Sequence, residues 1–331
     1  MTPVASSPLD TVVINSRAGG PGGARLGIVD GVFVGTGDDE AWRTIDARDG
    51  WVMPGATCLH ARPEDAQKLC RLGVTTAWFD RGPLAMTAGT AHLPPDAAPA
   101  GVWRVDPATE RIEVDDPTAV IDHRGCDGWH RSASSGRHIL LLDLRAAHGD
   151  AAASAAESGR RVILWVTTPD ELEAVVPLKH QVPAIHVRVP VDLVATEEPA
   201  VWAALTDGLI DSVDTAADSS VGALTALLRR GSAELAPGRV VDLVAGSLRR
   251  LTDVRAVFGD LEPGSRASFV VLDSATPGVS DVPTGDGELK LTVVQGRPVH
   301  FHGRDIDRVV PDDLLPVGHS TDEECAGSCV C

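Results

Sequence analysis

The chain has 331 residues, 43% of them hydrophobic, which suits one barrel-sized domain with a small accessory domain. Its formal net charge of −18 argues against a general nucleic-acid or anionic-membrane surface, because no basic run offsets the acidic residues. The first ten residues lack the charged and apolar regions of a signal peptide, and no apolar stretch approaches the ~18 residues of a membrane span. We therefore expect a cytoplasmic protein that binds neither nucleic acid nor membranes.

The N-terminal part of the chain predicts β-structure. Short β-rich runs alternate with glycine turns between residues 11 and 45, and Asp30-Gly31 is a strong hairpin signal. These features predict a small antiparallel sheet. After Pro54-Gly55 the pattern changes to a helix at 66–72 and a strand at 73–80. Residues 82–117 are rich in Pro, Ala, Gly and Thr and predict irregular structure.

From residue 138 onward, apolar strand patterns alternate with helix patterns. The expected strands are 138–143, 162–166, 184–189 and 209–213, and the expected helices are 146–158, 169–178, 201–206, 221–230 and 240–251. Repeated units of this kind predict a parallel sheet closed as a barrel. The segment is shorter than the roughly 250 residues of a typical eight-stranded barrel. Some helices should therefore be shortened or absent between residues 82 and 137, where the number of strands stays open.

Strand patterns return after residue 256, and residues 289–299 predict the closing hairpin of a β-sandwich. The predicted fold is thus α/β: a shortened TIM-type (β/α) barrel at 56–255 with a small composite β-sandwich. The N-terminal segment 11–55 and the C-terminal segment 256–303 would build that sandwich. An acidic, cysteine-containing tail follows at 304–331.

Short motifs mark both ends of this arrangement. The start carries Gly27-Ile28-Val29-Asp30-Gly31 and Val52-Met53-Pro54-Gly55, and the end carries the stretch 259–273. In this order the motifs resemble the dihydroorotase and hydantoinase branch of the amidohydrolase superfamily, over most of residues 11–303 and least at 82–137. The resemblance implies a hydrolase of cyclic amides with one or two divalent metals, usually zinc, at the carboxyl ends of the barrel strands.

The residues at the metal positions depart from the family's pattern. The motif Asp-x-His-x-His-x-Arg aligns with residues 58–64, where His60 remains and Arg62 replaces the second histidine. A guanidinium has no free lone pair for a metal. Trp165 stands where the family has a further histidine, and an indole cannot bind zinc.

The family's catalytic aspartate is also missing from its expected place. The late motif Thr-Asp-His-Ala-Pro falls on Thr215, Ala216 and Ala217. A methyl group cannot pass a proton from metal-bound water to the leaving amide. A shifted alignment offers Asp214 or Asp218 as candidate catalytic residues.

The count of metal ligands is low. No lysine lies between Lys68 and Lys179, so the carbamylated lysine that bridges two metals in the family has no counterpart. Catalytic zinc normally has three protein ligands, and the matched positions supply His60 alone. We therefore expect His60 to be vestigial and the barrel to lack a cofactor.

Two other clusters have the spacing of metal ligands. His123, Cys126 and His130 could bind zinc, although their spacing matches no familiar zinc framework and a glycine-rich loop explains them as well. In the tail, three cysteines lie within seven residues and could hold a soft metal ion or form a redox pair, or have no joint role: Cys325, Cys329 and Cys331.

Three functions are compatible with these patterns. The first is a dihydroorotase-like homologue that has lost its metal centre and acts as a structural or regulatory subunit. The resemblance implies a homo-oligomer or a complex with aspartate carbamoyltransferase in pyrimidine biosynthesis. The second is an active cyclic-amide hydrolase with a single zinc near His60, Asp80, Asp214 or Asp218. The third is a thiol or metal-binding protein that works through its C-terminal cysteines.

Overall fold

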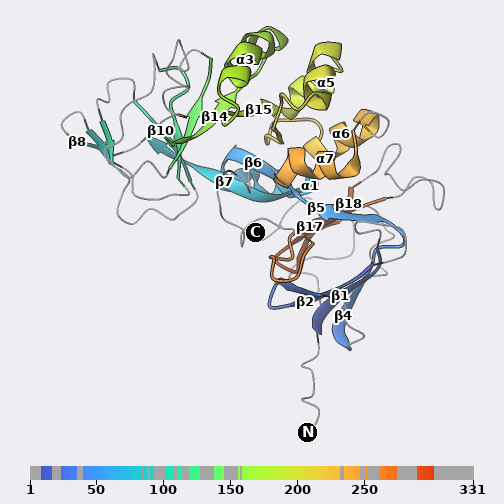
Figure 1. The fold of residues 1–331 in the computed structure, drawn as a ribbon. Coiled ribbons are helices and arrows are strands. Elements are labelled where there is room, and N and C mark those ends of the chain that lie inside the picture. The colour runs from blue at the N-terminus through green and yellow to red at the C-terminus, as the bar shows by residue number, and fades with distance from the viewer. Residues whose placement is uncertain are drawn as a thin grey trace.

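A computed structural model of the chain describes residues 9–16, 24–35, 40–83, 85–87, 90–92, 101–106, 111–113, 119–126, 138–144, 156, 159–231, 235–246, 251, 261–273 and 289–301. Its two main parts are visible in Figure 1, where a β-sandwich at the bottom carries a barrel with helices above it. Within the described residues, no helix is long and apolar enough to cross a membrane.

The first sheet of the sandwich contains four N-terminal strands. They are β1 (Leu9–Ser16), β2 (Ala24–Val29), β3 (Val32–Gly35) and β4 (Ala41–Asp46), in the order β3-β2-β1-β4. The prediction of an antiparallel sheet is wrong for one pair, because β1 and β4 are parallel. The chain leaves β3 at one edge and enters β4 at the opposite edge, so β4 is reached by a crossover and not by a hairpin.

The second sheet joins the two ends of the chain. Its order is β19-β18-β17-β5, with β5 (Trp51–Pro54), β17 (Phe269–Leu272), β18 (Leu289–Val294) and β19 (Arg297–Phe301). The β18–β19 hairpin confirms the one predicted at 289–299. The two sheets bury a shared apolar core in which the Phe33 and Phe269 rings lie 5.8 Å apart. The composite sandwich is therefore confirmed.

Eight parallel strands form the barrel, and they follow the chain order. They are β6 (Ala56–Ala61), β7 (Val74–Pro83), β10 (Gly101–Arg104), β12 (Val120–Asp122), β13 (Ile139–Leu142), β14 (Arg161–Trp165), β15 (His186–Pro190) and β16 (Ser212–Asp214). The last strand returns to the first, where the Thr215 N–H donates to Thr57 O at 3.4 Å. The barrel is nearly closed, and all eight strands are kept.

The barrel segment is shorter than that of a typical eight-stranded barrel, and its described helices are short. The described helices are η1 (Pro63–Asp65), α1 (Ala66–Arg71), α3 (Pro169–Gln181), α4 (Val191–Ala195), α5 (Pro199–Thr206), α6 (Ala223–Gly231), α7 (Pro237–Val241) and the π-helical turn η2 (Asp242–Gly246). Four of them, α1, α3, α5 and α6, match predicted helices within a few residues, whereas η1 and α4 were not predicted and the helix expected at 240–251 is a short α-helix followed by a π-turn. The helix predicted at 146–158 falls almost entirely outside the described residues.

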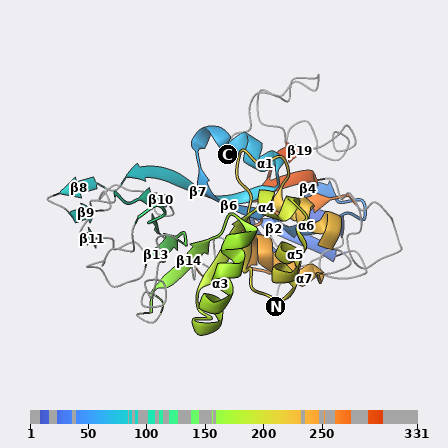
Figure 2. The same cartoon turned by 90° about the horizontal axis from the view of Figure 1, so that it is seen from above.

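Between β7 and β13 the described residues contain strands and no helix. The short strands β8 (Ala85–Thr87), β9 (Thr90–His92) and β11 (Arg111–Glu113) form a small separate sheet. Figure 2 shows it projecting away from the helices. The prediction of irregular structure at 82–117 is wrong for these strands and for β10, because local strand pairing forms there without a long apolar pattern.

The barrel strands present one face to the helices and the other to the barrel interior. Leu140, Leu142, Val162 and Leu164 belong to the large core that includes the helices. The alternate residues form a second apolar cluster inside the barrel: Leu59, Trp78, Val102, Val120, Ile139, Leu141 and Ile163. Since side chains alternate along a strand, this inward series continues to Asp80 on β7, to Asp122 on β12 and to Asp143 after β13.

Candidate functional site

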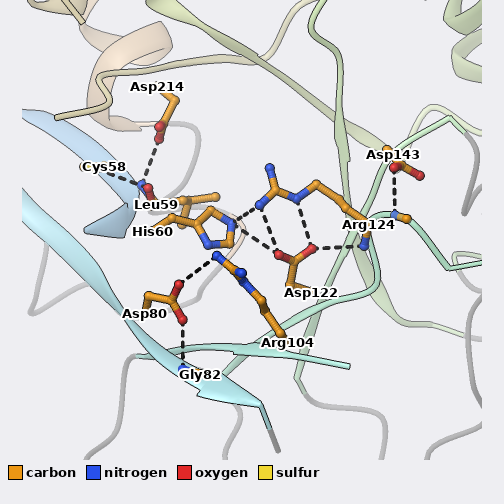
Figure 3. A network of polar contacts seen from close by, with 11 residues as sticks. Cys58, Leu59, His60, Asp80, Gly82, Arg104, Asp122, Arg124, Asp143 and Asp214 are labelled. Carbon is orange, nitrogen blue, oxygen red and sulfur yellow. Dashed lines mark hydrogen bonds and ion pairs between the residues drawn. The ribbon is translucent and has the colours of Figure 1, made fainter. Parts of the chain in front are cut away.

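His60 lies at the carboxyl end of β6, in an unusual backbone conformation. Its φ is +62°, and the pairing of β6 with β7 shifts register between Cys58 and Ala61. An irregularity of this kind re-aims a side chain from the regular alternation of a strand. In Figure 3 the imidazole points toward Asp122 and Arg124.

Arg124 holds His60 and Asp122 together. Its Nε and Nη2 atoms donate to the two Asp122 carboxylate oxygens, each at 3.0 Å, and its Nη2 lies 2.7 Å from His60 Nε2. A guanidinium only donates hydrogen bonds, so His60 Nε2 must be the acceptor. The lone pair that a metal would need is therefore directed at Arg124. Burial, and next to it the positive charge of Arg124, lower the pKa of His60 to about 4.

A second arginine, Arg104, pairs with Asp80 near the carboxyl end of β7. Arg104 donates from Nη2 to Asp80 Oδ2 at 3.0 Å, and Asp80 Oδ1 accepts the Gly82 N–H at 2.8 Å (Figure 3). This pair is more open to solvent, since the Arg104 side chain is 63% exposed. The carboxyl ends of the barrel strands, called the mouth of the barrel below, therefore carry two guanidinium groups beside their carboxylates.

A cavity of about 410 Å³ opens beside these pairs at the carboxyl ends of the central strands. Its lining combines two arginines, three acidic side chains and an indole: Arg104, Val105, Asp122, Arg124, Asp143, Trp165, Thr167 and Glu171. The Arg124 guanidinium lies 5.2 Å from the centre of the Trp165 ring, a cation–π distance. Glu171 is held by the capping box at the start of α3, with Thr168 as its partner. The described lining includes neither His60 nor Asp214 nor Asp218.

Asp214 ends β16 but is fixed inside the barrel. Its Oδ1 accepts the Leu59 N–H at 2.9 Å and the Arg188 Nε–H at 3.0 Å, and Arg188 Nη2 adds a further contact. Both side chains of this ion pair are almost fully buried. Arg188 also donates to Ser212 Oγ at 3.0 Å and to Thr57 O at 3.3 Å. The pair therefore links β15, β16 and β6 at the seam that closes the barrel.

The other candidate residues lie apart from this cluster. Asp218 is exposed in the turn after β16. Arg62, which stands in the aligned metal motif, is 64% exposed and pairs with Asp65 at 3.0 Å. His123 and Cys126 are buried in one turn, in which the Cys126 N–H donates to His123 O at 3.0 Å. His130 and the three tail cysteines lie outside the described residues.

The side chains that the structure describes at the mouth do not fit the divalent metal that the family resemblance implies. In the part of the chain that the structure describes, no three His, Cys, Asp or Glu side chains come together as a metal-binding group. Cys58 is buried, and burial raises the pKa of its thiol, so it stays protonated. A metal would have to displace Arg124 from both His60 and Asp122.

Sequence reasoning missed most of the residues that line the cavity, although it considered Asp122 as a further zinc ligand beside His123 and Cys126 and placed Trp165 at a ligand position. Asp122 ends the apolar strand β12 and Asp143 follows the apolar strand β13, a pattern that marks the carboxyl end of a buried barrel strand. That signal could have identified both aspartates. No sequence signal pairs Arg104 with Asp80, Arg124 with His60 or Arg188 with Asp214, because these contacts depend on how the strands are ordered around the barrel.

Comparisons with known proteins agree with this architecture. No family model matches the chain, and no curated protein matches it by sequence. Among solved structures, the L-hydantoinase (dihydropyrimidinase) of Arthrobacter aurescens is 18% identical with a TM-score of 0.59, covering 89% of this chain and 97% of its own. The D-hydantoinase of a Thermus species is 14% identical with a TM-score of 0.60 and the same two coverages.

A D-aminoacylase structure described as defining a novel subset of amidohydrolases is also similar. It is 14% identical, with a TM-score of 0.54, and the match covers 90% of this chain and 98% of its chain. At such low sequence identity these similarities show the arrangement of the helices and strands and do not show the activity. The chain therefore has the fold of the hydantoinases, a nearly closed barrel with an attached β-sandwich.

Proposed function

We propose that this protein is a non-catalytic homologue in the dihydroorotase and hydantoinase branch of the amidohydrolase superfamily, and that it acts as a structural or regulatory subunit. The observation that carries the proposal is the state of Asp214. It is one of the two carboxylates that lie two residues from Ala216, the position of the missing catalytic aspartate, and it is 1% exposed and bound to Arg188.

A general base must reach the proton that it abstracts. Asp214 lies outside the described lining of the mouth cavity and is held by the backbone of β6 and by a buried arginine. The three carboxylates that do line the cavity have partners of their own: Asp122 binds Arg124, Asp143 accepts the Gly125 N–H at 2.9 Å, and Glu171 caps α3. This arrangement supports a structural role for the barrel without catalysis.

A direct assay tests the loss of catalysis. We expect dihydroorotate hydrolysis, and hydantoin hydrolysis, to be indistinguishable from background with or without added zinc, because removing a catalytic metal or base typically costs several powers of ten in rate. Turnover that disappears in a His60→Ala variant would contradict the proposal. About one tightly held zinc per purified chain would instead favour the single-zinc hydrolase.

The proposed partner is aspartate carbamoyltransferase, or a second copy of this chain. The family resemblance suggests the first. The exposed surface supports association in general, since Trp42 is 77% exposed and lies on β4, an edge strand of its sheet. Solution mass measured alone and with aspartate carbamoyltransferase from the same organism tests both. If the protein is a monomer and does not bind aspartate carbamoyltransferase, the proposed subunit role is contradicted.

A further inference from the structure

We infer that the Arg124 guanidinium is the built-in structural cation of the barrel mouth, tying together groups on separate strands where a barrel of this fold would use a metal ion. The inference rests on the proposed function, because it concerns a barrel that holds no catalytic metal. It assigns a role to a side chain that no sequence motif identifies.

The contacts of Arg124 cross the mouth of the barrel. Arg124 follows β12 and binds Asp122 at the end of that strand through two hydrogen bonds. The same guanidinium reaches His60 on β6, although β7 and β10 lie between β6 and β12 in the sheet. It also lies over Trp165 at the end of β14, with β13 in between. One cation thus connects three strands that are not neighbours.

The groups around Arg124 need a positive charge. Asp122 is only 5% exposed, so its carboxylate would be strongly disfavoured without a cation. Because His60 Nε2 faces a guanidinium that only donates, the imidazole contributes a lone pair to this contact and no charge. Arg124 supplies both the charge for Asp122 and the donor for His60 Nε2.

Removing this guanidinium should leave a vacancy that a small cation can fill. We expect Arg124→Ala to lower Tm by roughly 5–10 °C, since it leaves a buried carboxylate unpaired. Guanidinium chloride at a few millimolar, far below denaturing concentrations, should restore part of this loss. Zinc chloride should also raise the Tm of the variant, because imidazole and carboxylate are ordinary zinc ligands. Neither salt should change the Tm of the wild-type protein.

Arg104→Ala is the matched control. It removes the same charge and a pair of the same 3.0 Å length from the same mouth, but Arg104 is 63% exposed. Its Tm should change by less than about 2 °C, with no rescue, because exposed ion pairs contribute little. Arg124→Lys should have an intermediate Tm and no response to guanidinium, since the planar fork is lost. Sodium chloride at equal ionic strength controls for screening.

The inference is overturned if Arg124→Ala keeps the wild-type Tm, or if it loses stability and responds to neither guanidinium nor zinc. Should that variant fail to fold, Arg124→Met combined with Asp122→Leu, which removes both charges, is expected to fold and to ignore both salts. Failure of the double variant would also count against the role of charge. Zinc-dependent turnover by the wild-type protein would contradict the proposed function, whereas an Arg124→Ala variant without rescue contradicts this inference alone.

Discussion

Among the described residues, Arg188 is the largest side chain that is completely buried, and its position explains why it is tolerated. Its donors are directed at Asp214, Ser212 and Thr57, on the two strands that meet at the barrel seam. The cost of burying two charges is offset only because the geometry satisfies them. The ion pair therefore adds side-chain hydrogen bonds between the strands that meet where the barrel closes, β16 and β6.

Replacing one partner of this pair should be severe. Arg188→Met leaves Asp214 buried and unpaired, and we expect the free energy of unfolding to fall by about 3–5 kcal/mol. The double variant Arg188→Met with Asp214→Leu should recover most of that loss, since it removes both charges. Urea unfolding of the three proteins measures the effect. A single variant within about 1 kcal/mol of the wild type would show that the pair is not needed at the seam.

Two buried histidines should make stability depend on pH. Burial, followed by nearby arginines, lowers the pKa of His60 and of His138 to about 4, below the ordinary value of 6.5. The unfolded chain therefore binds more protons than the folded one between those pH values. The part of the unfolding free energy that comes from keeping these histidines neutral is fully present above pH 6.5 and is lost as the pH falls toward 4. Each histidine contributes roughly 3 kcal/mol.

Unfolding free energies measured from pH 8 to pH 4 test this dependence. His138→Leu should reduce the slope between pH 6.5 and 4, because that side chain no longer titrates in the unfolded chain. An unchanged slope in this variant would mean that another group takes up the protons.

At the scale of the elements, one close approach sets the place of α6. Gly222 precedes α6, and a Cβ built there would lie 2.1 Å from the carbonyl oxygen of Leu72, at the end of α1. The neighbour is backbone, which cannot rotate away. A glycine is therefore required where the helix of the first barrel strand meets the helix that follows the last one.

Gly222→Ala should lower the free energy of unfolding by about 2–3 kcal/mol, as overpacking in a dense core does. Gly238 in α7 is the matched control, because a Cβ there meets nothing within 4 Å. Gly238→Ala should be neutral or slightly stabilising, since alanine restricts the unfolded chain more than glycine does. Chemical denaturation of both variants measures the difference. Equal effects would remove the argument from close approach.

At the scale of the whole molecule, the two ends of the chain share one sheet. β5 pairs with β17 from Phe269 to Leu272, so the sandwich forms only after the barrel segment has been made. The described structure ends at Phe301 in β19. The three tail cysteines follow outside the described residues, and their joint role stays a prediction.

Truncation tests that role. A chain ending at Glu324 should unfold at the same temperature as the full chain, because the three described apolar clusters use residues no later than 301. If Cys325, Cys329 and Cys331 bind Zn(II) or Cu(I) together, the truncated chain should bind less, and binding should weaken as pH falls because thiolate ligands must lose protons. Equal metal binding by both chains would exclude a tail site.

Much of the fold follows from local pattern. Apolar runs at 138–143 and 162–166 identify buried parallel strands, because both faces of such strands meet apolar neighbours. Turn and strand signals at 289–299 identify the closing hairpin. The sequence alone left open the strands between 82 and 137, where runs of three or four residues carry too little periodicity to be seen. It also misjudged β4, whose partner is decided by a crossover.

The site divides in the same way. The sequence by itself determined that Arg62, Trp165, Ala216 and Ala217 cannot supply ligands or a base, because these are properties of the side chains. Only the tertiary structure decided that Arg124 meets His60 from 64 residues away and that Arg188 meets Asp214. Barrel closure brings those residues together, and electrostatic pairing at a distance in sequence leaves no local pattern to read.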